Sequence, residues 1–458
     1  MRTARGRLFG TDGARGIANA DLSVELALRI GRAYGGWLSQ THAAPRVLLG
    51  RDTRVSGPML AAAVTAGLES AGAGVTDCGL LPSPALFLLV RDGQAAGAVM
   101  VSASHNPPEF NGLKLVDSQG LKLVGSLERL LEKLVFAQED AVLQDPSPRP
   151  TGEGVGTTAA APEAGERYLE LLAAQLPAGL DLGGRRVVLD CAWGAAYQTA
   201  PEAFRRWGAP AVALHAEPRG ELINVDCGAL HPEAVAREVL AQGADLGVAF
   251  DGDADRAMFV DETGAVRDGD YIKYLLAADL QERGLLDPPL VAGTVMSNLG
   301  LEIALRERGI RLLRAPVGDR FVAEEMRRTG ARLGGEQSGH LVFAALGLGD
   351  GLYSAARVCE VLARTGRPLS ELCAPLRKAP QVLINLRVSD KHAWEHSARL
   401  QAETRQWTER LAHRGRILIR PSGTEPLVRV MVEALDKELT HAAAEALAAV
   451  VREEWGCE

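Results

Sequence analysis

Short aliphatic runs alternate with amphipathic or alanine-rich stretches through the first three quarters of the chain, and this alternation limits the fold more than any other feature. Strands that are apolar on both faces and separated by helices pack into mostly parallel sheets, so the pattern predicts α/β domains. Ligands of such sheets bind beyond the carboxyl ends of the strands. The expected strands are residues 46–49, 97–101, 186–189, 246–250 and 290–292, and the expected helices are residues 58–70, 127–136, 232–242, 271–282 and 299–308.

The C-terminal segment of the chain changes character and predicts a small α+β module. A strand is expected at 381–388, a long helix from about 392–411, strands at 416–419 and 427–432, and a final helix after them. The 458 residues of the chain suggest about three domains at roughly 150 residues each, or a few more if some are small. The clearest linker is Gln144–Gly165, where four prolines and four glycines stand in a stretch without apolar periodicity. One domain is therefore expected to end near it.

Charge and cysteine usage exclude several classes of protein. The chain carries 50 basic and 58 acidic residues, a net charge of −8, so it has no general basic field for nucleic acid or an anionic membrane. Its six cysteines are scattered singly, and the N-terminal segment lacks the apolar stretch of a signal peptide. We therefore expect reduced thiols and a cytoplasmic protein that does not span a membrane.

The loop after the expected strand 97–101 carries a first group of chemically useful side chains. Its sequence SASHNPP places Ser104 beside His105, where the serine hydroxyl could carry or bind a phosphoryl group. An ordinary Asx-Pro turn capped by Ser104 is the alternative, and this segment alone favours it. Lys114 follows ten residues later and is one of only seven lysines. Its amine can relay a proton whereas arginine stays charged, although a solvated surface lysine is the simpler interpretation.

Three carboxylates follow the fourth expected strand at alternate positions. Asp251, Asp253 and Asp255 would repel one another at a buried strand end, so they predict a hard cation with oxygen ligands. An EF-hand loop is a serious alternative because Glu262 stands at its position 12, but Arg256 occupies position 6, where that loop needs glycine. The short spacing and the few ligands favour Mg²⁺ over a solvated acidic turn.

Two later loops combine turn-forming glycines with polar side chains. In GGEQSGH, Glu336 and Ser338 suit vicinal hydroxyls and His340 adds a donor whose charge can change, although incidental polar residues in a glycine turn are an equal alternative. In RPSGTEPLVR, Arg420 and Arg429 flank amides and hydroxyls that suit a phosphate dianion, and a plain β-turn is the weaker alternative. These amides and hydroxyls belong to the segment Ser422, Gly423 and Thr424.

The ordered set of motifs resembles the α-D-phosphohexomutases. The resemblance spans nearly the whole chain, through FGTDGARG, GRDTRVSG, SASHNPPEFNGLK, DGDADR, VGDR, GEQSGH and RPSGTEPLVRVMVE. It implies three related α/β domains with mixed, mostly parallel sheets and a smaller C-terminal α+β domain around a central cleft. The implied domains are residues 1–150, 160–256, 257–372 and 378–458.

The resemblance also implies a role for each motif residue. Ser104 corresponds to the family's phosphoserine. Ser104 and the three aspartates correspond to the family's ligands of Mg²⁺. Arg15, His105 and Lys114 correspond to positions that stabilise charge or transfer protons near the phosphoserine, and Arg256 closes the metal motif. The residues matched to sugar recognition are Glu336, Ser338 and His340, and those matched to the phosphate site are Arg420, Ser422, Gly423, Thr424 and Arg429.

The reaction that the resemblance implies moves a phosphoryl group between O6 and O1 of a phosphosugar, through a 1,6-bisphosphate that also acts as an activator. Gln337 favours the branch that interconverts glucosamine 6-phosphate and glucosamine 1-phosphate, which feeds UDP-N-acetylglucosamine and cell-wall precursor synthesis. A mannose or glucose phosphate mutase is one alternative, and a non-catalytic sugar-phosphate or Ca²⁺ sensor is another. Neither nucleic acid nor a membrane is an expected partner, and a homodimer is left open.

Two positions depart from the family's pattern. Ala254 replaces the second glycine of D-G-D-G-D-R, which would strain the metal loop if its backbone has a positive φ there. Trp193 replaces the usual asparagine in DCAWGA and leaves the polar contact of that loop undecided. Neither change removes an expected metal ligand or the expected nucleophile.

Overall fold

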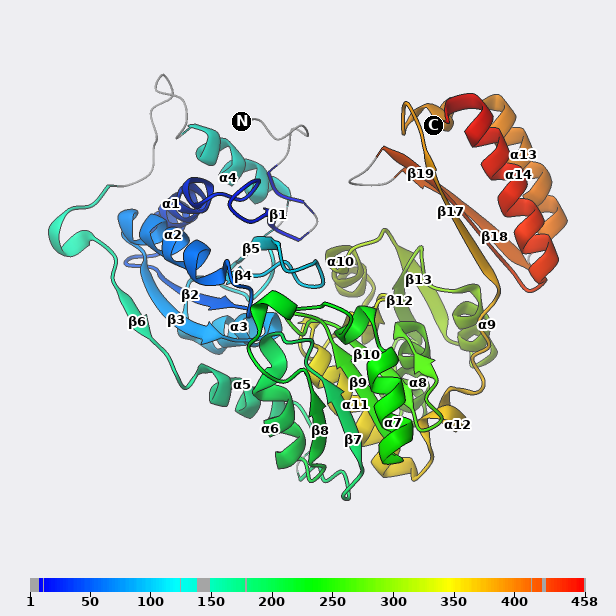
Figure 1. The fold of residues 1–458 in the computed structure, drawn as a ribbon, viewed down its shortest axis with the longest axis horizontal. Helices are drawn as coiled ribbons and strands as arrows, with labels where there is room; N and C mark the ends of the chain where they lie inside the picture. Colours follow the sequence, from blue (N-terminus) through cyan, green and yellow to red (C-terminus); the bar gives the residue numbers. More distant parts are fainter. Residues whose placement is uncertain are drawn as a thin grey trace.

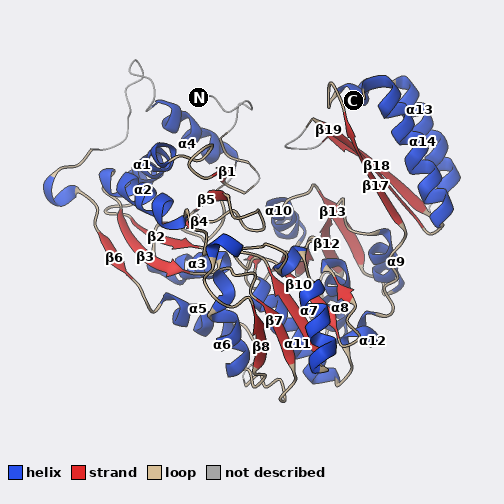
Figure 2. Ribbon diagram, in the orientation of Figure 1, coloured by secondary structure: helices blue, strands red, loops and turns tan. Residues whose placement is uncertain are grey.

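The computed structural model describes residues 8–10, 12–123, 125–137, 149–177, 179–412, 414–421 and 426–456. In this part of the chain, four sheets follow one another along the sequence and helices cover them (Figures 1 and 2). One sheet has six strands, two have five and the last has three. The predicted fold class, three α/β domains followed by a smaller C-terminal α+β domain, is confirmed.

The first sheet has the order β1-β5-β4-β2-β3-β6. Strands β4, β2, β3 and β6 are parallel, whereas β5 is antiparallel to both β4 and β1. β4 is buried on both faces, because Val99 packs with α1, α2 and α4 while Met100 packs with α3. The elements are β1 (Ala14–Ile17), α1 (Val24–Thr41), β2 (Arg46–Arg51), α2 (Gly57–Ser70), β3 (Gly74–Leu80), α3 (Ser83–Leu89), β4 (Gly97–Val101), β5 (Phe110–Val116), α4 (Gly125–Ala137) and β6 (Thr158–Ala160).

The second sheet has the order β11-β10-β9-β7-β8. β9, β7 and β8 are parallel, and β10 and β11 extend the sheet as antiparallel strands. The carboxyl end of β9 therefore lies in the middle of the sheet. The elements are α5 (Ala164–Ala173), β7 (Val187–Asp190), α6 (Thr199–Arg206), β8 (Ala211–Leu214), α7 (Glu233–Gln242), β9 (Leu246–Phe250), β10 (Ala257–Asp261) and β11 (Val266–Arg267).

The third sheet is mixed in the same way, with the order β13-β12-β14-β15-β16. Its first three strands are parallel, and β15 and β16 are antiparallel. The elements are α8 (Gly269–Glu282), β12 (Leu290–Thr294), α9 (Leu299–Glu307), β13 (Arg311–Ala315), α10 (Asp319–Thr329), β14 (Leu333–Gly335), β15 (Leu341–Phe343), β16 (Leu348–Gly349), α11 (Gly351–Thr365) and α12 (Leu369–Cys373).

The C-terminal sheet is antiparallel, with the order β17-β19-β18, and α13 and α14 pack against it. The predicted long helix is shorter than expected because Ser397 caps α13, its hydroxyl accepting a 3.0 Å hydrogen bond from the backbone N–H of Leu400. The elements are β17 (Gln381–Arg387), α13 (Ala398–Leu411), β18 (Gly415–Pro421), β19 (Leu427–Ala434) and α14 (Lys437–Trp455).

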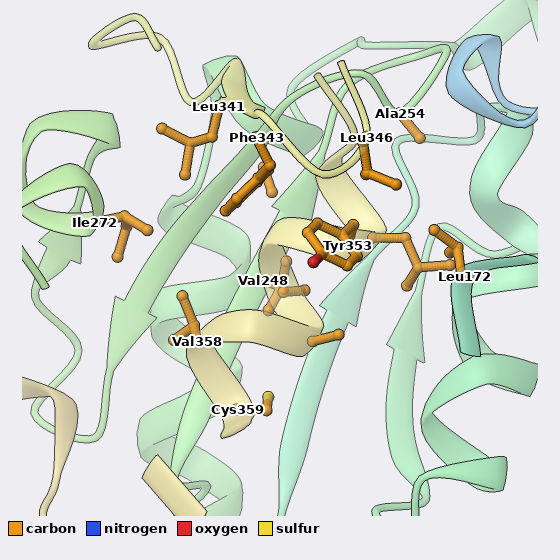
Figure 3. Packing of buried hydrophobic residues seen from close by; sticks show 14 of the residues in the cluster. Leu172, Val248, Ala254, Ile272, Leu341, Phe343, Leu346, Tyr353, Val358 and Cys359 are labelled. Atoms are coloured by element: carbon orange, nitrogen blue, oxygen red, sulfur yellow. The ribbon is translucent and has the colours of Figure 1, made fainter. Parts of the chain in front are cut away.

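One hydrophobic core joins the first three domains. It runs from α3 through α5 and the second sheet to α8 and α11. Figure 3 shows its centre, where Leu172, Val248 and Tyr353 come from α5, β9 and α11. The rings of Phe343 and Tyr353 meet edge to face with centroids 4.9 Å apart. Because close-packed cores deform little, the strand ends of these three domains are held in a defined arrangement.

The predicted linker carries more structure than expected. Its residues 144–148 lie outside the described ranges, but β6 lies within it and pairs in parallel with β3 at the edge of the first sheet. The aliphatic pattern missed this strand because β6 is short and exposed. No helix in the described part of the chain is long and apolar enough to cross a membrane.

Candidate active site

The loops that follow β4 and β9 meet at the boundary between the first two domains. The hydroxyl of Ser104 donates a 2.6 Å hydrogen bond to Oδ2 of Asp251, although 147 residues separate the two in sequence. Both residues are only 1% exposed. The structure thus brings together the first two groups that the sequence places at strand ends.

The backbone of the serine loop is held from several directions. Ser104 has a left-handed backbone (φ 52°), and its N–H donates to Oγ of Ser102 at 2.9 Å. Its carbonyl oxygen accepts hydrogen bonds from Arg54 at 3.0 Å and from Asn224 at 2.9 Å. Asp52 holds the buried Arg54 guanidinium at 3.0 Å and accepts from Ser102 at 2.6 Å. These contacts offset a backbone strain of about 1 to 2 kcal/mol and aim the serine hydroxyl at the aspartates.

The three aspartates form a compact acidic group. Asp251, Asp253 and Asp255 are buried, and each offers an oxygen within 4.8 Å of the others. Burial, followed by repulsion from Asp255 and Asp253, raises the pKa of Asp251 to about 7. In the described part of the chain, Oδ1 of Asp253 is buried without a hydrogen-bond partner. Buried carboxylate oxygens without a partner are costly, so this donor set fits a hard divalent cation such as Mg²⁺.

Lys114 inserts its ammonium among these carboxylates. Its Nζ lies 2.6 Å from Oδ2 of Asp253, 3.2 Å from Oδ2 of Asp12 and 3.5 Å from Oδ2 of Asp255. Burial opposes the charge on Lys114, but the carboxylates outweigh burial and raise its pKa above the ordinary value. Of the two roles that the family resemblance implies for Lys114, this arrangement favours charge stabilisation over proton transfer.

His105 contacts the serine, and Arg15 contacts the serine loop. Nδ1 of His105 is 3.3 Å from the Ser104 hydroxyl, and burial together with Arg256 and Arg15 lowers the pKa of His105 to about 3. His105 is therefore neutral near pH 7. Arg15 donates to Oδ1 of Asn106 at 3.3 Å, within the same loop. Two guanidiniums thus stand near the serine, where they favour an anionic group.

The loop between β14 and β15 brings the third domain to the acidic group. Ala257, just after the aspartates, donates its N–H to the carbonyl of Gly339 at 3.2 Å. Gly339 has a φ of 90°, and a side chain there would collide with the Ala257 carbonyl. Glu336 accepts a 3.0 Å hydrogen bond from the N–H of Gly318, and Ser338 is partly exposed on the same loop.

His340 connects that loop to the aspartates directly. It is 4% exposed, and its Nδ1 lies 3.4 Å from Oδ1 of Asp255. Burial opposes a charge on His340, but Asp255 and Asp319 outweigh burial and raise its pKa. The charge of this imidazole is therefore set by neighbours from two domains.

The two arginines that flank the predicted phosphate loop lie on the C-terminal sheet. Arg420 and Arg429 are directly opposite each other on β18 and β19. Like charges at such positions repel, and burial together with Arg429 lowers the pKa of Arg420. Arg420 donates weakly to the sulfur of Met296 in the third domain at 3.8 Å. Two opposed guanidiniums suit a dianion between them, and the predicted Ser422, Gly423 and Thr424 lie outside the described residues.

A second group of metal-binding side chains has an evident structural role. Ligand atoms of Asp190, His215 and Cys227 lie within 4.8 Å of one another. The two Asp190 oxygens already accept from the N–H groups of Ala192 at 2.8 Å and Gly228 at 2.9 Å, and Nδ1 of His215 lies 3.0 Å away. Asp190 therefore ties together the loops after β7 and β8.

Both departures from the family pattern are accommodated. Ala254 has a φ of 57°, so the strain expected from the missing glycine is present. Trp193 also has a left-handed backbone, and its carbonyl accepts a 2.5 Å hydrogen bond from the hydroxyl of Thr53. Its ring packs against His215 with centroids 5.0 Å apart. The loop thus contacts the first domain through its backbone.

Comparisons with known proteins agree along the whole chain. Models of phosphoglucomutase/phosphomannomutase match alpha/beta/alpha domain I at residues 6–142, domain II at 166–264, domain III at 268–379 and the C-terminal domain at 383–450. A phosphoglucosamine mutase of Moorella thermoacetica is 49% identical over 434 residues, which are 94% of this chain and 96% of that protein.

Solved structures share the arrangement of domains. A phosphoglucomutase/phosphomannomutase family protein of Burkholderia thailandensis superposes with a TM-score of 0.79 and 26% identity, over 97% of each chain. An Aspergillus fumigatus N-acetylphosphoglucosamine mutase in complex with GlcNAc-6P and magnesium has a TM-score of 0.68 and 19% identity, over 99% of this chain and 97% of its own. At that identity, the likeness to the Aspergillus protein shows the fold alone.

Proposed function

This chain belongs to the phosphoglucomutase/phosphomannomutase family of isomerase-type phosphotransferases, and on that premise we propose that it interconverts glucosamine 6-phosphate and glucosamine 1-phosphate. The phosphoglucosamine mutase that is 49% identical over nearly the full chain supports this substrate. The observation that carries the proposal is the Ser104 hydroxyl, 2.6 Å from a buried acidic group that fits Mg²⁺. The product would enter UDP-N-acetylglucosamine and cell-wall precursor synthesis.

The proposed reaction transfers a phosphoryl group twice. Phosphorylated Ser104 gives its phosphoryl group to O6 or O1 of the sugar monophosphate, whose hydroxyl loses its proton, and a 1,6-bisphosphate forms. The bisphosphate reorients, and its other phosphate returns to the Ser104 oxygen. Each transfer breaks one P–O bond and makes another. Added bisphosphate can give one of its phosphoryl groups to the serine, and it therefore acts as an activator. The proton that the sugar hydroxyl loses ends on the Ser104 oxygen, whose hydroxyl then lies 2.6 Å from Oδ2 of Asp251.

Ser104 and the three aspartates would hold Mg²⁺, which when bound neutralises charge on the phosphoryl oxygens. Support comes from the partnerless oxygen of Asp253 and from the magnesium named with the Aspergillus structure. Lys114 at Asp253, Arg256 at Asp255 and Arg15 at Asn106 would add positive charge toward the transferred group. Positioned charge of this kind is the main source of catalysis in phosphoryl transfer.

Recognition of the rest of the substrate is proposed for the third and fourth domains. Glu336, Ser338 and His340 would bind the sugar hydroxyls, because they lie on a loop held beside the aspartates. Arg420 and Arg429 would hold the phosphate that is not reacting, with the segment 422–424. Their like charges, placed directly opposite each other, support an anionic ligand.

One assay tests this proposal. The purified protein is supplied with Mg²⁺, a trace of sugar 1,6-bisphosphate and, separately, the 6-phosphates of glucosamine, glucose and mannose. We expect the largest kcat/KM with glucosamine 6-phosphate, because Gln337 distinguishes this branch. Larger values with glucose or mannose phosphates would support the alternative mutases. No turnover with any of them would favour a sugar-phosphate or Ca²⁺ sensor. Light scattering of the same sample tests whether the protein is a homodimer.

A further inference from the structure

Six charged side chains from the first three domains form a closed ring in which carboxylates alternate with basic groups. The ring runs beside the acidic group and shares Asp255 with it. Its shortest contacts belong to Lys122, whose Nζ lies 2.5 Å from Oδ1 of Asp12 and 2.7 Å from Oδ2 of Asp319. The other separations are Asp12–Lys114 3.2 Å, Lys114–Asp255 3.5 Å, Asp255–His340 3.4 Å and His340–Asp319 3.7 Å.

We propose that Lys122 is a positioning residue of the mutase reaction. By joining Asp12 of the first domain to Asp319 of the third, it fixes where Lys114 and His340 stand relative to the acidic group. The inference deepens the proposed function and rests on it. Lys122 belongs to none of the motifs that carry the family resemblance.

The local backbone places Lys122 for this task. Lys122 pairs with Val116 at the end of β5, and the N–H of Leu123 donates to the carbonyl of Leu115 at 3.1 Å. The same strand carries Lys114, so one hairpin carries both ammonium groups, one reaching the aspartates and the other reaching α10. Asp319 is the first residue of α10, where the helix dipole favours a negative charge.

The surroundings make these ion pairs stronger than surface pairs. The side chains of Lys122 and Asp319 are each 19% exposed and that of Asp12 is 18% exposed, so water screens them only partly. Removing one partner of such a pair leaves a carboxylate without compensation. A cavity of about 650 Å³, lined among others by Lys122, Asp319 and His340, leaves these side chains room to rearrange.

Loss of Lys122 should therefore displace His340 rather than unfold the protein. His340 stands between Asp255 and Asp319, and an uncompensated Asp319 would attract the imidazole away from Asp255. A small displacement of this kind is sufficient to slow a reaction by about 100-fold. Substrate binding should change less than kcat, because His340 is one of three proposed sugar-binding residues, and Glu336, Ser338 and Arg420 are not members of the ring.

The test compares Lys122→Met, Lys122→Arg, Asp319→Asn and the double variant Lys122→Met/Asp319→Asn, all in the full chain. Lys133→Met is the matched control, since Lys133 is exposed on α4 of the same domain. We expect Lys122→Met to lower kcat about 100-fold and to raise KM by a smaller factor, and arginine to restore part of kcat because it keeps the charge. Intact mass should still show phosphate on Ser104.

The double variant makes the outcome decisive. If Lys122 acts through Asp319, the double variant should lose no more kcat than Lys122→Met alone, because the two side chains form one unit. Losses that multiply, an unchanged kcat in Lys122→Met, or a change confined to the melting temperature would overturn the proposal. If Lys122→Met does not fold, the double variant takes its place, because it leaves neither charge of the Lys122–Asp319 pair without a partner. Its kcat is then compared with that of Asp319→Asn. A wild-type protein without turnover would instead refute the proposed function, and the Lys122 proposal with it.

Discussion

The first three domains and the C-terminal domain differ in how they are held. The first three share one continuous core, whereas the C-terminal sheet and its helices α13 and α14 have a separate core of their own. In Figure 1 the C-terminal domain stands beside the third domain and away from the first. Ser104 and the three aspartates thus lie in the three domains that share a core, and the proposed phosphate-binding arginines lie on a separately packed unit.

The attachment between these two regions is mostly polar. Glu433 is fully buried and accepts hydrogen bonds from Leu299 N–H at 3.1 Å and from Arg416 at 2.6 Å. Arg416 also donates to the carbonyl of Ser297 at 2.8 Å, and Asn298 donates to that of Ala379 at 3.1 Å. Polar contacts of this kind are typical of domains that move relative to each other. Such freedom would suit the proposed bisphosphate, which reorients between the two transfers.

The largest effect should come from the first three domains, at Ser104. Ser104→Ala should lower kcat by at least roughly four orders of magnitude, because the covalent step is lost, and the fold should persist. Intact-protein mass should show a phosphate-sized addition on some wild-type molecules and none on the variant. Ser118→Ala, an exposed serine of the same domain, is the control. Wild-type turnover in Ser104→Ala would contradict the phosphoserine mechanism.

Asp253→Asn should have the next largest effect. The change removes one charge from the acidic group with little change of shape, so Mg²⁺ affinity and kcat should fall together, kcat by about 100-fold. Ca²⁺ should bind the wild type but support little turnover, because it is larger and less demanding in geometry. Calorimetric titration with Mg²⁺ measures the affinity. If His215→Ala loses Mg²⁺ binding and Asp253→Asn does not, the metal binds at Asp190, His215 and Cys227 and not at the three aspartates.

A smaller effect is expected in the C-terminal domain, and it should differ in kind. Arg420→Ala removes a charge-assisted hydrogen bond worth ~1.5 to 3 kcal/mol, or roughly one to two decades in substrate binding. Free 1,6-bisphosphate should also rise during single turnover of phosphorylated enzyme, because the anchor is weakened. Arg420→Lys should rescue only in part, and the exposed Arg387→Ala should behave as wild type. If Arg420→Ala binds the substrate normally and releases no more 1,6-bisphosphate than the wild type, Arg420 does not hold the phosphate.

The smallest effect concerns pH and the contact between the second and third domains. Asp350 caps α11 and accepts a 3.0 Å hydrogen bond from the hydroxyl of Tyr168, and burial raises its pKa from 3.8 to about 6. Its protonated form therefore adds stability below about pH 4 that is lost as the pH rises through 6. The side chain of the Asp350→Asn variant cannot ionise. As the pH rises through this range, the free energy of unfolding of the wild type should therefore fall by on the order of 2 kcal/mol relative to that of the variant.

Scanning calorimetry at pH 4.5 and 7.5 measures that change. The transition of the shared core should respond, and the transition of the C-terminal domain should not, because its core is separate. Glu307→Gln, an exposed carboxyl on α9, is the control. An equal response of both transitions would contradict the division of the molecule into two separately held regions.

Much of this molecule can be read from local sequence. The expected strands and helices correspond to β2, β4, β7, β9 and β12 and to α2, α4, α7, α8 and α9. Ser104 and the three aspartates are recognisable because each stands directly after a buried strand, and Ala254 has the positive φ that its position implies. Periodicity and turn chemistry depend on neighbours within a few residues, so they are visible in one sequence.

Other parts of the site arise only from tertiary contacts. The sequence assigns no role to Arg54, Asn224, Asp12, Lys122 and Asp319, although three of them lie within the quoted motifs, yet they hold the serine loop and the charged ring. These contacts join residues that stand 50 to 197 positions apart in the sequence. Whether a charged side chain is solvated or buried against an opposite charge depends on which segments the fold brings together. The pKa values of Asp251 and His105, and the separation of the C-terminal arginines from Ser104, therefore follow from packing and not from local pattern.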